Sequence, residues 1–465
     1  MPAMIRTTIA AAGAALLLAA APTTAQSQQE RLDARYDRAL AAGYKALFLC
    51  SAIANAERNG SGRSAESVER WEMTGIQAPL DAIVPELSAS VVRDDEGVID
   101  GVLVDWAKDM PPRVAVHHVG HGCRAAPVGA TLTSLENAIR DPVGPATIYT
   151  QPPRLAPIVA PQGNLEPVVG QAFAETYGEG SRTTAVLVRQ GRATVGEAYD
   201  DDFGPNTPQR TWSVAKSIAA TLVGAAVESE GVDVLAPSDL GESSDDPRRA
   251  ITLDHLLRMA SGRYSDTPGN RTDPLYFGGS TVAETAAHWP LLHPAGTVYR
   301  YANNDTLMAV AMIDHVLDQS PPAEFFKRVG MPHTVAERDM AGDYILSSQV
   351  WSTARDLAVL GELYLDDGVL PSGERVLPAD WVEYVSSPSG PQPEGRGIGY
   401  GAGLWLFNQN EGIPPDTFAA MGNRGQYVVI VPSRDVVIVR RGEDPAGSRF
   451  DILAFTRDVL AALEN

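Results

Sequence analysis

The placement of the β-like runs after residue 164 constrains the fold more than any other feature. Such runs occupy 183–199, 400–407, 426–432 and 435–442. Helical patterns dominate between about 253 and 385. Strands at both ends of a domain with helices between them predict an α+β fold, in which an antiparallel sheet is assembled from the two ends and flanked by helices.

The chain before residue 165 follows a different pattern. A helical stretch at about 30–54 precedes short β-like runs between 87 and 119, which predicts a small α/β appendage over 26–140. Residues 141–164 are rich in proline and show neither periodicity, so we expect them to link the appendage to a domain over 165–465.

The first residues are typical of a secretory signal peptide. Arg6 precedes an apolar stretch over 9–21, and small residues lead to a cleavage site after Ala25. The stretch is shorter than the about 20 residues that span a bilayer. The sequence therefore predicts a signal peptide over 1–25, a periplasmic or secreted protein, and no membrane span in the mature chain. A short N-terminal anchor helix is the alternative.

Charge excludes one class of partner. The chain has 58 acidic and 37 basic side chains, a formal net charge of -21 spread along its length. A protein that tracks nucleic-acid phosphates needs the opposite field, so no nucleic-acid partner is expected.

The chain has only two cysteines, Cys50 and Cys123. In an exported protein such an even pair is most simply a disulfide, and two unconnected buried thiols are the alternative. His117, His118 and His121 precede Cys123 closely, but no second ligand cluster lies elsewhere in the sequence. We therefore expect surface or core histidines and no metal.

The segment "TWSVAKSIAATLVGAAV" (211–227) places a serine three residues before a lysine at the start of an apolar run. If Ser213 lies in the first turn of a helix, Lys216 lies one turn further along the same face. A serine hydroxyl becomes a good nucleophile when a neighbouring base takes its proton, and burial lowers the pKa of a lysine toward that role. The alternative is a helix-capping serine.

Two later segments extend the pattern. Tyr301 and Asn303 stand in "YAN" at the start of another apolar helix, and "GNRGQ" (422–426) is a glycine-flanked turn into a strand. The order S-x-x-K, Y-x-N, glycine-flanked strand entry resembles the serine hydrolases of the class C β-lactamase and penicillin-binding superfamily. The resemblance spans about 165–463 and is closest to the 6-aminohexanoate-dimer hydrolase and esterase-like branch.

The resemblance implies roles for the first two motifs. Ser213 would be the acylated nucleophile, Lys216 its proton partner and Tyr301 the second acid/base group. Asn303 would orient Lys216 and the substrate carbonyl. The alternatives are a buried aromatic for Tyr301 and a helix N-cap for Asn303.

The third motif departs from the family pattern. β-Lactamases carry Lys or His where this chain has Asn423, and Arg424 replaces threonine. In a strand, Arg424 would point away from Asn423. The resemblance implies that the Gln426 backbone N–H completes the oxyanion hole and that Gly425 is small so that substrate can approach. Without the cation, efficient β-lactam hydrolysis is not expected.

The sequence thus predicts an exported serine hydrolase that cleaves a small ester or linear amide, such as a short peptide or an aminohexanoate-like oligomer, through an acyl-enzyme on Ser213. No cofactor is expected. The enzyme alternative is a β-lactamase or D-alanyl-D-alanine carboxypeptidase, and the non-enzyme alternative is a binding protein that kept the fold.

Overall fold

The structure is a computed structural model, which describes residues 27–135, 156–264 and 272–464 apart from 239, 242 and 396. The predicted signal peptide over 1–25 and residues 141–155 of the predicted linker lie outside the described residues. The chain forms two compact units, one up to Tyr36 and one from Asp37 onward. The sheets, the disulfide and the cavity lie within the second unit.

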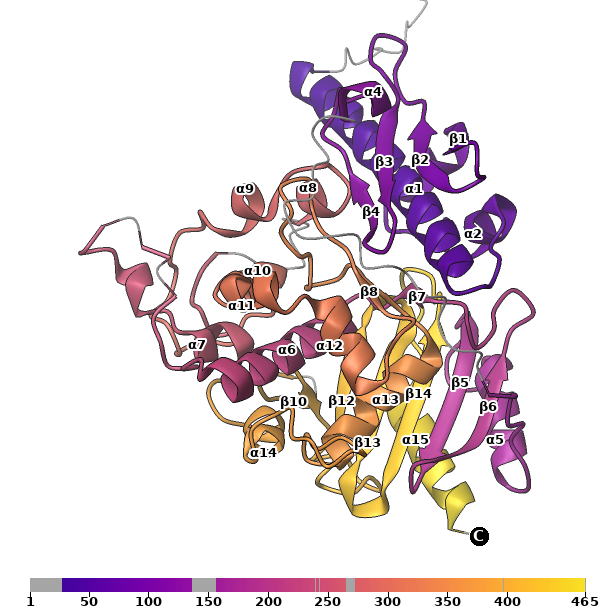
Figure 1. Ribbon diagram of the computed structural model, residues 1–465, viewed down its shortest axis with the longest axis vertical. Helices are drawn as coiled ribbons and strands as arrows, with labels where there is room; N and C mark the ends of the chain where they lie inside the picture. The colour runs from indigo at the N-terminus through magenta and orange to yellow at the C-terminus, as the bar shows by residue number, and fades with distance from the viewer. Residues whose placement is uncertain are drawn as a thin grey trace, which may run out of the picture. The chain divides into compact units, whose positions relative to one another are not determined.

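A seven-stranded antiparallel sheet joins the two ends of the predicted domain (Figure 1). Its strands in spatial order are β10 (Gly399–Tyr400), β11 (Trp405–Leu406), β12 (Phe418–Gly422), β13 (Gln426–Val431), β14 (Val436–Gly442), β5 (Thr183–Gln190) and β6 (Ala193–Tyr199). The early strand β5 pairs with the late strand β14, for example through Val188 and Ile438. The predicted α+β sheet assembled from both ends is therefore confirmed.

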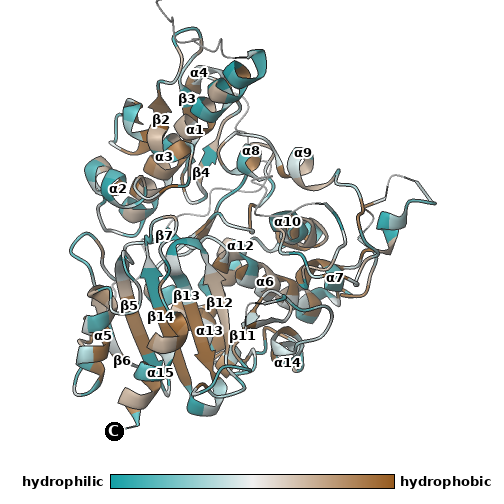
Figure 2. Cartoon of the chain, turned by 180° about the vertical axis from the view of Figure 1, so that it is seen from behind, coloured by the Kyte–Doolittle hydropathy of each residue, from teal (hydrophilic) through white to brown (hydrophobic). Residues whose placement is uncertain are grey.

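The sheet is buried on both faces. On β13, Val428 and Ile430 pack into the cluster that holds helices α6 (Val214–Glu230) and α13 (Ala354–Leu365). The alternate residues Val429 and Val431 pack with α5 (Leu165–Phe173) and α15 (Ile452–Leu463). This explains why the central strands are continuous apolar runs, which appear brown in Figure 2, rather than alternating ones.

The middle of the chain forms a helical region beside α6. Its helices are α7 (Leu253–Leu257), α8 (Asp273–Tyr276), α9 (Val282–Ala286), α10 (Asn303–Ala311), α11 (Asp314–Gln319), α12 (Pro322–Val329) and, later in the chain, α14 (Trp381–Ser386). A small sheet of β7 (Gln209–Arg210), β9 (Val350–Ser352) and β8 (Val335–Ala336) leads the chain into α6.

The N-terminal segment, defined here as residues 37–135, contains a four-stranded meander. The meander consists of β1 (Ala89–Arg93), β2 (Ile99–Val104), β3 (Arg113–His118) and β4 (Gly122–Ala125). The segment also contains α1 (Gln28–Arg58) from residue 37 onward, α2 (Ala65–Trp71), α3 (Leu80–Ile83) and α4 (Leu132–Leu135). Its apolar cluster continues into the rest of the unit, because Phe48 of α1 packs near Trp351 and Tyr44 near Phe277. The two parts therefore share one core.

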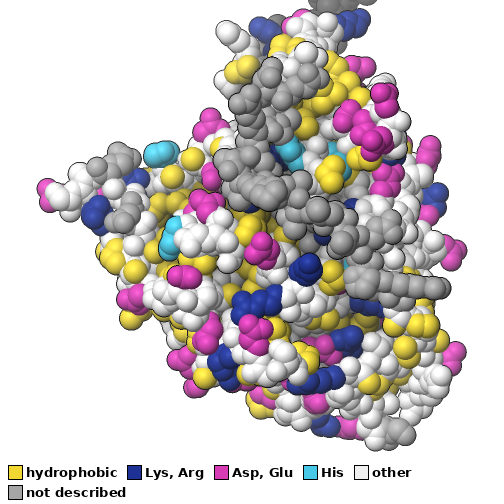
Figure 3. Space-filling view, viewed as in Figure 1, with side chains coloured by type: hydrophobic (Ala, Val, Ile, Leu, Met, Phe, Trp, Pro, Cys, Tyr) yellow, Lys and Arg dark blue, Asp and Glu magenta, His cyan; other side chains and the backbone are white. Residues whose placement is uncertain are grey.

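Helix α1 is, among the described residues, the one helix long and apolar enough to cross a membrane. Its apolar stretch of 18 residues is completely buried inside the protein, and α1 residues such as Phe48 and Cys50 are fully inaccessible to solvent. This environment fits the core helix of a folded domain. On the surface, Figure 3 shows acidic and basic side chains interspersed over the visible face.

The predicted disulfide between Cys50 and Cys123 is present. It joins α1 to β4, and the Cys123 N–H donates to the buried carboxylate of Glu337 over 2.9 Å. Burial raises the pKa of Glu337 to about 7. The disulfide thus ties the meander to α1 where the N-terminal segment meets the rest of the chain.

Free-thiol titration of the unreduced, denatured protein is expected to find no reactive thiol, since both cysteines are bridged. Reduction is expected to lower the free energy of unfolding by about 4 kcal/mol, because the sequence separation is 73 residues and long loops gain most from closure. Two titratable thiols in the unreduced protein would contradict the bridge.

Candidate active site

The turn before α6 presents Ser213 to an open cavity. Trp212 has a φ of 49°, a left-handed conformation that non-glycine residues adopt rarely and at some energetic cost. The neighbouring Thr211 N–H is held by the Val350 carbonyl over 2.8 Å. Ser213 follows as the N-cap residue of α6, but its side chain caps no backbone N–H. The hydroxyl is therefore available for chemistry.

Lys216 lies one turn further on and contacts that hydroxyl. Its Nζ is 3.0 Å from Ser213 Oγ, 2.7 Å from Asn303 Oδ1 and 2.8 Å from the Ser347 carbonyl oxygen. The side chain is 2% exposed. The predicted serine–lysine pair is thus formed geometrically inside the protein.

Burial lowers the pKa of the Lys216 ammonium from 10.5 to about 7. A neutral amine has two N–H donors and one lone pair. The three oxygens around Nζ can all accept from the protonated form. When the amine is neutral, its two N–H groups can stay with Asn303 Oδ1 and Ser347 O, and its lone pair can then accept the hydroxyl hydrogen of Ser213. The surroundings therefore fit the form of lysine that can accept a proton.

Asn303 holds the amine in place. Helix α10 begins at Asn303, with Ala302 as its N-cap and no side-chain cap, so the N-cap alternative for Asn303 is wrong. Its Oδ1 accepts from Lys216, while its Nδ2 donates to Thr272 Oγ1 over 2.8 Å. The second hydrogen bond fixes which end of the amide faces the lysine.

Tyr301 lies beside Lys216 and lines the same cavity as Ser213. Lys216 Nζ is 5.1 Å from the centroid of its ring, so the protonated form of the lysine lies within the range of a cation–π contact. The ring packs against Tyr400 and Trp405. Tyr301 and Ser213 both line the cavity. All the residues predicted from the first two motifs are therefore brought together.

The cavity has a volume of about 1070 Å³. Besides Ser213 and Tyr301 it is lined by Thr272, Asp273, Tyr276, Tyr299, Arg300, Asn303, Glu394, Trp405, Met421, Gly422, Asn423, Arg424, Asp444 and Arg449 among others. Groups of both charges thus reach it. Burial raises the pKa of the Asp273 carboxyl to about 6 despite the nearby Arg210.

The third motif forms the expected glycine-flanked turn into a strand, and the strand begins only at Gln426. Residues Asn423–Gly425 make a single 3-10 turn between β12 and β13, and Arg424 has a left-handed φ of 57°. Asn423 is exposed and lines the cavity, whereas Arg424 is 7% exposed and pairs with Glu443 over 2.7 Å. The expected strand geometry at Arg424 is wrong, because the turn occupies these positions.

Two predictions for the next residues also need correction. A Cβ on Gly425 would lie 1.8 Å from Arg440 Nη1 and 2.2 Å from Asp444 Oδ2, so the position is small to admit this ion pair. Gln426 is completely buried, bonds to Gly442 and Arg441, and does not line the cavity. These residues support the turn and are not part of the cavity wall.

Gly422 approaches the nucleophile instead. A Cβ there would lie 3.1 Å from Ser213 N and 2.4 Å from the Thr211 carbonyl oxygen, which leaves no room for a side chain. Within the described part of the chain, the N–H groups of Ser213 and Asn423 donate no hydrogen bond. Gly422 thus brings the 422–423 turn against the backbone of Ser213, and Ser213, Gly422 and Asn423 all line the cavity.

No metal site is formed by the described residues, where no group of three or more His, Cys, Asp and Glu could hold an ion. Near the disulfide, His117 Nδ1 lies 2.8 Å from the Ile99 carbonyl oxygen. The His117 ring therefore links β3 to β2 within the meander.

Sequence reasoning missed several members of the site. Thr272 and the Ser347 carbonyl stand in loops without a motif, and only the fold brings them to Asn303 and Lys216. Gly422 is the first residue of "GNRGQ", and a glycine at this position could have indicated a close approach of the backbone to Ser213.

Comparison with known proteins identifies the family of the chain. Residues 170–460 match the Beta-lactamase family. A Paenarthrobacter ureafaciens protein named 6-aminohexanoate-dimer hydrolase is 25% identical over 351 residues, which cover 69% of this chain and 84% of that protein.

Solved structures share the fold. A Bacillus anthracis protein named as a 6-aminohexanoate-dimer hydrolase aligns with a TM-score of 0.52 at 22% identity, over 61% of this chain and 79% of that one. A Bacteroides dorei protein named as a beta-lactamase gives 0.51 at 17% identity, over 65% and 98%. Since the family match covers more than half of its length, this chain belongs to the Beta-lactamase family of serine hydrolases.

Proposed function

We propose that the protein is an exported hydrolase that cleaves small esters or linear amides through an acyl-enzyme on Ser213. The observation that carries the proposal is the buried Lys216 amine, 3.0 Å from Ser213 Oγ and satisfied on its other side by Asn303 and Ser347. A binding protein that had only kept the fold would have no use for a lysine whose pKa is lowered to about 7 beside a serine hydroxyl.

The reaction follows from these positions. Lys216 Nζ takes the Ser213 proton as Oγ bonds to the substrate carbonyl carbon, and the carbonyl oxygen takes the negative charge. The N–H groups of Ser213 and Asn423 are the donors we assign to that oxygen, in place of Gln426. The bond to the leaving alcohol or amine then breaks, and the leaving group takes the proton through Lys216 or Tyr301. Water repeats the sequence and frees Ser213.

The third motif favours substrates without a carboxylate beside the reacting bond. Asn423 has no charge, and Arg424 is occupied by Glu443 and by backbone carbonyls. A cavity of about 1070 Å³ with both acidic and basic side chains at its wall suits a linear amide or ester with polar ends. The relative named 6-aminohexanoate-dimer hydrolase agrees with an amide of this kind.

Export rests on two features. The pattern of residues 1–25 is that of a signal peptide, and a disulfide such as Cys50–Cys123 persists in oxidising compartments. A periplasmic or secreted location is therefore part of the proposal.

Replacing Ser213 by alanine is expected to abolish both turnover of p-nitrophenyl acetate and covalent labelling by a fluorophosphonate, measured by intact-protein mass spectrometry. Ser217→Ala is the control, since Ser217 lies on the same helix and donates only to the Gly403 carbonyl. Ester turnover by the Ser213→Ala protein equal to that of the control would exclude this mechanism.

The pH dependence of kcat/KM should report Lys216. Because burial places the lysine pKa at about 7, the amine is protonated below that value and cannot accept the serine proton. We expect kcat/KM to rise about tenfold per pH unit up to about 7 and to level off above it. Lys216→Ala should lose roughly 10² to 10⁴ in rate together with this rising limb. An unchanged profile in the Lys216→Ala protein would contradict the assignment.

Asn423→Lys tests the choice between substrates. Restoring a cation at the cavity wall is expected to raise acylation by a penicillin more than hydrolysis of p-nitrophenyl acetate, because only the penicillin carries a carboxylate. The measurement is the ratio of the two kcat/KM values, with Asn423→Gln as the uncharged control. A wild-type protein that already prefers the penicillin would favour the β-lactamase or D-alanyl-D-alanine carboxypeptidase alternative.

A further inference from the structure

The N-terminal segment contributes to the wall of the cavity that holds Ser213. Ile76, Gln77 and Leu80, together with Gly75 and Tyr44, line that cavity. These residues come from outside the part of the chain that matches the Beta-lactamase family, which begins at residue 170. A substrate bound at Ser213 therefore faces two separate parts of the chain.

Arg424 fixes the position of this wall. Its Nη1 donates to the carbonyl oxygens of Trp71 and Glu72 over 3.3 and 3.2 Å, and its Nη2 donates to the Thr74 carbonyl. Helix α2 ends at Trp71, and the carbonyls of a helix end carry a partial negative charge without an intrahelical partner. The third-motif arginine thus caps a helix of the N-terminal segment.

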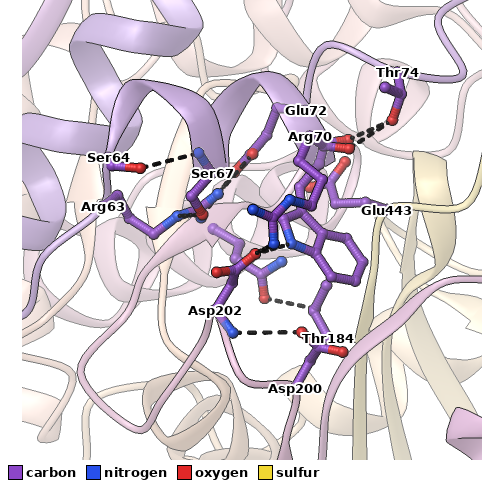
Figure 4. A network of polar contacts seen from close by, with 12 residues as sticks. Arg63, Ser64, Ser67, Arg70, Glu72, Thr74, Thr184, Asp200, Asp202 and Glu443 are labelled. Carbon is purple, nitrogen blue, oxygen red and sulfur yellow. Dashed lines mark hydrogen bonds and ion pairs between the residues drawn. The ribbon is translucent and has the colours of Figure 1, made fainter.

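Further polar contacts hold the same helix end (Figure 4). Arg63 forms a buried bidentate pair with Glu72 over 2.8 and 3.0 Å, and Arg182 donates to the Arg70 carbonyl over 2.8 Å. Arg70 also pairs with Asp202 over 3.0 Å. Contacts from several segments therefore converge on the end of α2, directly before the residues that line the cavity.

Gly75, the first residue of this wall, is also held by the loop that follows β14. The Gly75 carbonyl accepts from Ala446 N over 2.7 Å, and a Cβ on Gly75 would lie 2.3 Å from Pro445. Ala446 itself lines the cavity. The wall is therefore anchored at its start to the loop that follows β14.

The surface that this wall offers is largely apolar. Ile76 and Leu80 are 8% and 4% exposed and belong to the apolar cluster of the N-terminal segment. Tyr276 and Phe277 belong to the same cluster and also line the cavity. Gln77 is exposed. This end of the cavity fits an alkyl chain or ring rather than a charged group.

We propose that residues 75–80 are a specificity-determining wall, which limits the size of the apolar group that the substrate carries on this side of the scissile bond. Arg424 is its positioning residue, since its guanidinium is bound by Glu443 and by the carbonyls at the end of α2, although the residue also lines the cavity. The proposal rests on the acyl-enzyme function proposed for Ser213. It adds that substrate choice is set partly by the N-terminal segment.

The test compares kcat/KM for p-nitrophenyl acetate, butyrate and octanoate. Leu80→Ala enlarges the cavity and is expected to raise the octanoate-to-acetate ratio at least about tenfold, the usual effect of space for one or more methylenes. Leu87→Ala is the matched control, because Leu87 is 3% exposed in the same cluster and does not line the cavity. Its ratio should stay within about twofold of the wild type.

Gln77→Trp tests the opposite change from an exposed position, where folding is not at risk. It should lower the octanoate-to-acetate ratio about tenfold. Arg424→Lys keeps the charge beside Glu443 but loses the planar fork, so KM for octanoate should rise more than kcat falls. A mere loss of folded protein would lower kcat and leave KM unchanged.

The outcomes separate the two proposals. If the wild type turns over none of the esters and Ser213 takes no label, the proposed function fails. If the wild type is active but Leu80→Ala and Gln77→Trp keep its octanoate-to-acetate ratio, the wall proposal alone is overturned.

Discussion

The site depends on one buried amine. A lysine that is 2% exposed must lose its charge or find partners, and Lys216 has three oxygen neighbours from three separate segments. Ser213 comes from its own helix, Asn303 from the start of α10 and Ser347 from the loop before β9. Any shift of α10 or of that loop would remove an acceptor and change the pKa of the base. The packing of the helical region is therefore part of the chemistry.

The seven-stranded sheet holds the other part of the site, the turn between β12 and β13. Because it is buried on both faces, β12 and β13 cannot slip by one residue without moving apolar side chains out of two clusters. The register places Gly422 opposite Gln426, at the point where the chain turns through Asn423–Gly425. That turn holds Gly422 against the backbone of Ser213, as the short distance from a Gly422 Cβ to Ser213 N shows. The approach of this turn to the nucleophile thus follows from long-range strand pairing.

The sequence was sufficient for features that depend on local pattern. Apolar runs predicted the strands of the sheet, and the spacing of Ser213 and Lys216 on one helix face predicted their contact. It was insufficient where tertiary contacts decided the conformation. The strand orientation used for Arg424 did not hold, since Arg424 lies in the turn with a left-handed φ and its guanidinium binds Glu443 and the end of α2, contacts that no local pattern signals. Similarly, position 425 must be glycine because the ion pair of Arg440 and Asp444 fills the space of a side chain. These two residues lie outside the motif, so the motif alone does not reveal the reason.

The core shared between the N-terminal segment and the rest of the chain has a consequence for how such a protein could evolve. Phe48 and Tyr44 complete a cluster that also contains Phe277 and Trp351, so neither part has a finished polar surface of its own. Changes on the apolar face of either part would therefore have to be matched by changes on the other. Deleting the segment would leave an open hydrophobic core.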